Sequence, residues 1–300
     1  MKIDKQNGNV AFEDSSHTYW NVNDNRKYIS VTTLIERYAQ EFDKEFWSAY
    51  KALEKLLPKE SWAIEKKSLL NTKKFNRDIL DAYNISELEF NKTQQDILDK
   101  WSEENRKSCE RGTKIHKEIE ESFYAHPKDI SLQKFGLGGK FECKKDYSEL
   151  DLEYGVYPEY LIYRESDDGI LRIAGQVDLI VKQGNEITII DHKTNREIKQ
   201  KAGFNTQTKF TAKMKYPLNN IDDSNFWHYT LQLSTYAWML QKINPNFIIK
   251  DLILNHYDHT GKNTLYHCEY LKHDVEKMLY HYKKELILKE KRDKRKRIEY

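Results

Sequence analysis

The sequence has few cysteines and no long apolar run. Its three cysteines, Cys109, Cys143 and Cys268, are widely spaced and odd in number, which favours a reducing cytoplasm over a disulfide framework. Three are also too few for a four-cysteine iron–sulfur cluster, so we expect none. No apolar run approaches the ~20 residues that a transmembrane helix needs, so we expect no membrane partner.

Other signals are missing as well. Residues 1–14 contain acidic side chains and no apolar stretch, so neither a secretory signal nor a transit peptide is expected, and we expect a cytoplasmic protein. No G-x-x-x-x-G-K-[ST] loop is present, so we expect no nucleotide cofactor and no ATP-driven motor in this chain. The net charge of +2 neither requires nor excludes nucleic acid as a partner. A chain of 300 residues is long enough for a sizeable buried core.

Residues 174–194 predict two β-strands joined by a turn. Apolar side chains at 177, 179 and 181 alternate with the side chains between them, residues 183–185 supply turn chemistry, and residues 187–190 form a β-branched apolar run. Because residues two apart in a strand face the same side, Asp191 and Lys193 can converge at the end of the second strand, near Asp178 of the first.

Two carboxylates and an ammonium group in one small volume suit a particular chemistry. Hard divalent cations such as Mg²⁺ are held by one or two carboxylates together with water and substrate phosphate oxygens. A lysine beside them can orient the water or stabilise developing charge. A D-x-K sequence alone is common, however, and by itself it more often marks an ordinary surface ion pair, here between Asp191 and Lys193.

Three further motifs surround this hairpin. His116 ends a G-x-x-x-H element on a helix predicted over residues 93–124, and Glu159 lies in a strand predicted over residues 157–163. Gln232 and Tyr236 form a Q-x-x-x-Y element, one turn apart on a helix predicted over residues 227–243. Each alone fits a structural role, as a solvated histidine, a solvent-facing strand residue or a packed tyrosine.

The ordered set of motifs resembles the PD-(D/E)XK nucleases, specifically the RecB-type branch with its phage-type members and the mitochondrial genome-maintenance exonuclease. The resemblance implies an α/β fold, with a restriction-endonuclease-like central mixed sheet flanked by helices and an α-rich N-terminal section. It implies that Asp178, Asp191 and Lys193 are the catalytic signature, assisted by Glu159. It also implies that Mg²⁺ or Mn²⁺ is held by four residues: His116, Asp178, Asp191 and the backbone carbonyl of His192.

The same resemblance implies the activity. We expect a metal-dependent deoxyribonuclease, a hydrolase that acts as an exonuclease on single-stranded or free-ended DNA in replication, recombination or repair. Gln232 and Tyr236 would contact the scissile strand. A helicase or a recombination or single-strand-binding protein is an expected partner, in the host cytoplasm if the protein is phage-encoded. An endonuclease of the same fold and a non-catalytic DNA-binding or recombination accessory module are the alternatives.

A basic stretch follows the hairpin. Cations with interleaved aromatic residues suit a single-strand path, because cations track phosphates and rings stack on bases, although charge runs are usually solvated surface. The candidates for DNA binding in this stretch are Arg196, Lys199, Lys201 and Lys209.

The remaining elements complete the predicted organisation. Residues 1–95 are expected to form an N-terminal hairpin and helical section packed on the core, 96–275 the nuclease core, and 276–300 a C-terminal helix with a basic tail. Within them we expect one helix over residues 34–57, ended by Pro58, and a loop, with or without a short strand, over residues 128–153. The tail fits either a frayed solvated helix end or a nonspecific DNA contact.

Overall fold

The computed structural model describes residues 2–144, 152–205 and 210–298. The chain divides into two compact units, one of residues 1–40, 114–204 and 210–300, the other of residues 41–113 and 205–209. The predicted division at residues 95 and 275 stays a prediction. Among the described residues, no helix combines the length and apolar character that crossing a membrane requires.

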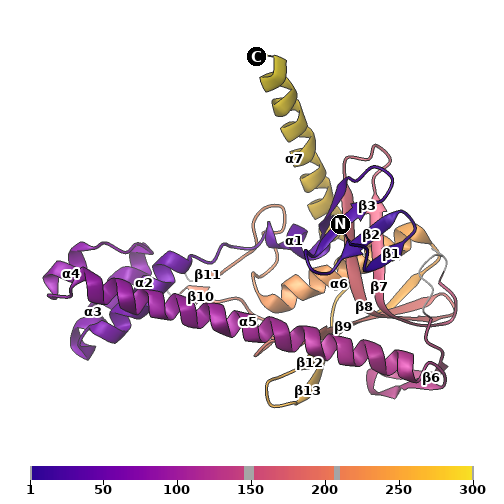
Figure 1. Ribbon diagram of the computed structural model, residues 1–300, viewed down its shortest axis with the longest axis horizontal. Helices are drawn as coiled ribbons and strands as arrows, with labels where there is room; N and C mark the ends of the chain where they lie inside the picture. Colours follow the sequence, from indigo (N-terminus) through magenta and orange to yellow (C-terminus); the bar gives the residue numbers. More distant parts are fainter. Residues whose placement is uncertain (1, 145–151, 206–209, 299–300) are drawn as a thin grey trace. The chain divides into compact units, whose positions relative to one another are not determined.

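The first unit is built on a mixed sheet to which nine strands of the described chain contribute, in the order β1-β2-β3-β4-β8-β9-β12-β13 with β7 beside β8 (Figure 1). These strands are β1 Lys5–Asn7, β2 Val10–Glu13, β3 Thr18–Asn21, β4 Lys27–Ser30, β7 Gly155–Glu165, β8 Arg172–Gln183, β9 Glu186–Lys193, β12 Ile248–Tyr257 and β13 Asn263–His267.

Strand β8 is the centre of this sheet. It pairs with β7 in antiparallel fashion along one edge, and along the other edge it pairs with β4 near its start and with β9 near its end. The predicted hairpin is confirmed as β8 and β9, and β9 continues the sheet by parallel pairing with β12. The predicted α/β class with a central mixed sheet is therefore confirmed.

Helices and a small second layer cover the two faces. Ile187 and Ile189 of β9 pack toward α1, α6 and α7, whereas Ile190 packs on the opposite face with the end of α5 and a small antiparallel pair, β5 and β6. This alternation buries both faces, as expected for a strand with a continuous apolar run. The elements are α1 Val31–Glu36, α5 Glu87–Ala125, β5 Ile130–Leu132, a 3₁₀ turn Gln133–Phe135, β6 Leu137–Phe141, α6 Asn225–Ile243 and α7 Lys272–Ile298.

The structure corrects two expectations about the loops and helices. The single helix expected over residues 34–57 is two helices, because the Asp43 side chain accepts a hydrogen bond from the Phe46 N–H at 2.9 Å and starts a new helix at Lys44. Pro58 does end that helix, and it also begins the next. Residues 128–153, expected to form a loop with or without a short strand, contain two short strands, β5 and β6, in their described part.

The second unit is helical. Its core gathers apolar residues from α2, α3, α4 and the first half of α5, including Phe46, Leu53, Leu80 and Phe90. The remaining described elements are α2 Lys44–Leu56, α3 Lys59–Thr72 and α4 Asp78–Ala82, together with the short paired strands β10 Phe204–Asn205 and β11 Phe210–Thr211.

Gly175 of β8 is a point of close contact between α6 and the sheet. A Cβ atom at this position would lie 2.6 Å from Cε1 and 2.9 Å from the hydroxyl oxygen of Tyr236, which is itself buried. Glycine is therefore needed here for space, and it sets the depth at which α6 lies on the strand.

We predict that Gly175→Ala destabilises the protein by about 1–3 kcal/mol, because the buried Tyr236 ring must shift to make room for the methyl group. The free energy of unfolding in urea measures the effect. Gly138→Ala is the matched control, since no heavy atom lies within 4 Å of the Cβ position there. Equal stability of the two variants would contradict the packing argument.

Candidate metal centre and active site

The ladder between β7 and β8 is interrupted at Glu159 and Asp178. Pro158 pairs with Leu179 and Tyr160 with Val177, so Glu159 lies opposite Asp178 without being paired to it. The backbone of Glu159 has φ +49°, a left-handed conformation that is uncommon for a residue other than glycine. Such strained positions persist where the surrounding structure holds them, often at functional sites.

Both strands change face at this point. Tyr157 and Tyr160 of β7 belong to the core cluster under α6, as do Val177 and Ile180 of β8. A regular strand places residues two apart on one face, whereas these are three apart. The expected alternation of positions 177, 179 and 181 is therefore wrong: Leu179 packs on the opposite face from Val177.

His116 of α5 faces the two carboxylates. Its Nδ1 atom lies 3.6 Å from Oε1 of Glu159 and 3.5 Å from Oδ2 of Asp178, and one ligand atom from each of the three residues lies within 4.8 Å of the others. Its Nε2 atom donates a hydrogen bond to the carbonyl oxygen of His192 at 3.0 Å. A ring nitrogen that donates to a backbone carbonyl fixes the orientation that a metal-binding histidine requires.

Asp191 and Lys193 converge as the strand period predicts. The Lys193 Nζ atom lies 2.6 Å from Oδ2 of Asp191, and the Asp191 side chain is only 2% exposed. Among the described residues, none donates a hydrogen bond to Oδ1 of Asp191. A buried carboxylate oxygen without a donor is costly in a protein interior and is suited to a cation.

Burial and neighbouring charges shift the pKa of each group. Burial raises the pKa of Asp191 to about 6, although the nearby Lys193 ammonium opposes this. The pKa of Asp178 is also raised by burial, against the opposing effect of His116. Burial alone would lower the pKa of His116, but the carboxylates of Asp178 and Glu159 outweigh it and raise the pKa to about 9. The carboxylates thus favour the protonated, positively charged form of His116. A divalent cation would neutralise the charge of these carboxylates more fully than that proton does.

Lys193 remains charged at this site. Burial lowers its pKa, but Asp191 and Asp178 more than compensate, so its pKa is raised above the usual value. The ammonium lies 4.6 Å from the centre of the Tyr229 ring of α6, a cation–π contact. Lys193 is therefore a fixed positive charge and hydrogen-bond donor, not a base.

Several residues of the site escaped the sequence analysis. Gln176 donates a short hydrogen bond to Oε2 of Glu159, and Asn255 of β12 lies with its side-chain amide 3.0 Å from Nδ1 of His192. Burial lowers the pKa of His192 to about 3, so its ring is neutral and the amide donates to it. Gln176 lies two residues before Asp178 in the same strand β8 and could have been noticed from its place in GQVD. Asn255 carries no local signal.

The predicted Gln232 and Tyr236 pair is buried in α6. The side-chain amide of Gln232 donates to the Tyr236 hydroxyl at 3.2 Å, and these side chains are 7% and 3% exposed. Their contact with a nucleic-acid strand stays a prediction. In this structure Tyr236 packs α6 against β8 at Gly175.

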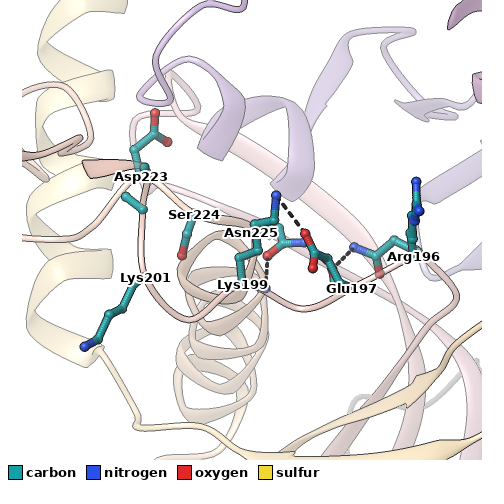
Figure 2. A pocket seen from close by; sticks show the side chains of 10 residues that line it. Arg196, Glu197, Lys199, Lys201, Asp223, Ser224 and Asn225 are labelled. Atoms are coloured by element: carbon teal, nitrogen blue, oxygen red, sulfur yellow. Dashed lines mark hydrogen bonds and ion pairs between the residues drawn. The ribbon is translucent and has the colours of Figure 1, made fainter. Parts of the chain in front are cut away.

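The basic candidates lie beyond β9. Arg196, Lys199 and Lys201 are exposed and line a polar cavity of about 730 Å³ at the start of α6 (Figure 2). Lys209 lies outside the described residues. The lysine and arginine residues between positions 289 and 296 of α7 are exposed along the part of the helix that projects from the sheet (Figure 1).

A mixed sheet that brings acids, a histidine and a lysine together on adjacent central strands defines a candidate divalent-metal hydrolytic site. The model of the PD-(D/E)XK nuclease superfamily matches residues 74–296, and the chain belongs to this superfamily. No curated protein matches the sequence significantly. The crystal structure of SSO0001 is similar at 14% identity with a TM-score of 0.36, covering 86% of this chain and 75% of that one. Membership implies a metal-dependent nuclease with DNA as its substrate.

We predict that the metal-free protein loses stability as pH rises from about 6.5 to 9. The pKa of His116 in the folded protein is raised to about 9, above its value of 6.5 in the unfolded chain. Its contribution to the free energy of unfolding is therefore complete below pH 6.5 and is lost as the pH passes through about 9. This contribution amounts to about 3 kcal/mol at most. Urea unfolding in a chelator measures it. His116→Gln should show a smaller loss over this range, and the exposed His273→Gln should behave as wild type. Identical pH dependence in wild type and His116→Gln would contradict the assignment.

Proposed function

We propose that this protein is a nuclease that hydrolyses DNA phosphodiester bonds with Mg²⁺ or Mn²⁺ bound at the His116, Glu159 and Asp178 cluster and at Asp191. The observation that carries the proposal is the buried Asp191 carboxylate, which is 2.6 Å from Lys193 through one oxygen and has no described hydrogen-bond donor at the other. A purely structural ion pair has no need for a second cluster of buried acids beside it.

The donor set fits a divalent cation. Carboxylate oxygens suit Mg²⁺, and the imidazole of His116 would allow Mn²⁺ as well. The His192 carbonyl accepts one hydrogen bond from His116, so a second lone pair is left for the cation. Bound there, the metal would lower the pKa of a coordinated water and neutralise charge on the phosphate.

The remaining residues act by orientation. Lys193, held between Asp191 and the Tyr229 ring, would position the attacking water and stabilise negative charge near Asp191. Gln176 fixes one oxygen of Glu159 and the His192 N–H fixes one oxygen of Asp178 at 2.6 Å, so both carboxylates are held before substrate arrives. Gln232 and Tyr236 would contact the scissile strand from α6.

We further propose that the chain is a RecB-type exonuclease acting on single-stranded or free-ended DNA in replication, recombination or repair. The ordered motifs from His116 to Tyr236 support this branch. The exposed residues Arg196, Lys199 and Lys201 after β9 support a single-strand path on which they would track phosphates, and the sequence adds Lys209 to this set. Action in the cytoplasm beside a helicase or a single-strand-binding protein belongs to the same proposal.

We predict that Asp191→Ala and Lys193→Ala each lower the rate of DNA cleavage by at least about 10³-fold. The first removes a carboxylate that would hold the metal, and the second removes the positive charge that would stabilise the reacting phosphate. Folding and DNA binding should be largely retained. Single-turnover cleavage of a labelled oligonucleotide measures the rate, and circular dichroism and anisotropy check folding and binding.

Glu186→Ala and Lys250→Ala are matched controls for these variants. Glu186 begins the same strand β9 that carries Asp191 and is paired with Lys250 in an exposed ion pair, so the controls remove an equivalent pair at the opposite end of the strand. Both should cleave at the wild-type rate. Cleavage at the wild-type rate by Asp191→Ala would contradict the assignment of Asp191 to the active site.

We predict metal-dependent loss of linear DNA with circular DNA spared. Linear and circular substrates, single-stranded and duplex, are incubated with Mg²⁺, Mn²⁺ or chelator, and the end label reveals the polarity. Cut circles would instead establish an endonuclease. DNA binding without cleavage under any metal would favour the accessory-module alternative.

A further inference from the structure

A second polar site lies at the start of α6. We call it the α6 pocket, a cavity of about 730 Å³ (Figure 2). The segment that follows β9 forms one wall and the residues that lead into α6 form the other. Its functionally relevant lining residues are Asn195, Arg196, Lys199, Lys201, Asp223 and Ser224.

Ser224 occupies the N-cap position of α6 but does not cap it. Its backbone is extended, with φ −138° and ψ 158°, yet its side chain accepts no hydrogen bond from the first turn. The residue is 7% exposed, and among the described residues its Oγ atom has no hydrogen-bond partner. An N-cap serine usually satisfies its hydroxyl on the helix, whereas this buried hydroxyl is left without a described partner beside the pocket.

The start of a helix of 19 residues attracts anions. The N–H groups of the first turn lack helical partners and carry the positive end of the helix dipole. Of these groups, the Phe226 N–H already donates to the Lys199 carbonyl oxygen at 3.4 Å. A hydroxyl donor beside such an end is a recurring arrangement for binding phosphate oxygens.

Charges around the pocket favour an anion as well. Lys199 is paired with Glu197 at 2.7 Å, and Asp223 is occupied by His228 at 2.6 Å and by the Gln40 N–H at 2.9 Å. Within the described part of the chain, Arg196 and Lys201 have no ion-pair partner. Two cations therefore remain for a ligand once the internal pairs are set aside.

The α6 pocket is connected to the candidate active site. Asn195 lies two residues after Lys193 and donates a hydrogen bond to the Tyr229 hydroxyl at 3.0 Å. The Tyr229 ring in turn contacts the Lys193 ammonium at 4.6 Å. A single DNA strand could therefore place one phosphate at the acid cluster and another phosphate in the α6 pocket.

We propose that the α6 pocket binds a second phosphate of the substrate strand, through the Ser224 hydroxyl, the first turn of α6 and the Lys201 ammonium. This proposal rests on the proposed nuclease function, whose substrate it describes in more detail. The bound group is either an internal phosphodiester or the phosphomonoester at a strand end, since both present the same anionic oxygens. Its role is to hold the strand in register while another phosphate reacts.

The test measures DNA binding in a chelator, so that no cleavage occurs. The probes are single strands of about 12 nucleotides, labelled at the 3′ end and carrying either a 5′-phosphate or a 5′-hydroxyl. Fluorescence anisotropy should show that Ser224→Ala and Lys201→Gln each weaken binding by about three- to tenfold. Lys201→Gln should also reduce the slope of log affinity against log salt by roughly 0.7, the value for one phosphate contact on a single strand.

Matched controls remove the same groups elsewhere. Ser16→Ala and Lys262→Gln change an exposed serine and an exposed lysine outside the pocket and should bind as wild type. Ser224→Thr keeps the hydroxyl and should restore most of the affinity. Thermal unfolding of Ser224→Ala checks that α6 still folds.

The probes distinguish the two sources of phosphate. A loss confined to the 5′-phosphorylated strand identifies a terminal phosphate, and an equal loss for both strands identifies an internal one. Unchanged affinity in Ser224→Ala and Lys201→Gln, or no wild-type binding to either strand, overturns the proposal even if the wild type cleaves DNA with metal. Weakened binding in a protein that never cleaves would overturn the nuclease function and leave the phosphate site standing.

Discussion

The burial of several carboxylates at the centre of one sheet is the constraint on which the site depends. Asp178, Asp191 and Glu159 lie on three neighbouring strands, where burial penalises their charge. His116 and Lys193 offset part of this penalty from two sides. The protein thus holds a local excess of buried negative charge, which other parts of the fold must stabilise and which a cation would relieve.

The supporting packing comes from segments far apart in the sequence. The end of α5 brings His116 over the sheet, and α6 brings Tyr229 to Lys193 while Gly175 lets it approach closely. Because the end of α5 and α6 pack into apolar clusters on the two faces of the sheet, the charged groups have little freedom to separate. The geometry is consequently a property of the whole first unit, not of the hairpin alone.

The sequence predicts the hairpin and its convergent Asp191 and Lys193 well, because the strand period and the turn residues are local signals. It does not predict the change of face at Glu159 and Asp178, since that change breaks the period on which the prediction relies. Asn255 and Ser224 were missed for another reason. The role of each depends on its burial beside a segment that is distant in the sequence. No local spacing pattern in the sequence can predict such a contact.

The long helix α5 also constrains how the chain length can vary. Phe123 and Tyr124 pack into the apolar layer on one face of the sheet, and His116 lies seven to eight positions earlier, about two helical turns away. Inserting or deleting a single residue between them would rotate His116 by about 100° away from the acids. Insertions and deletions among related chains should therefore be rare in this interval, whereas the earlier turns of α5 carry no such constraint from the metal site.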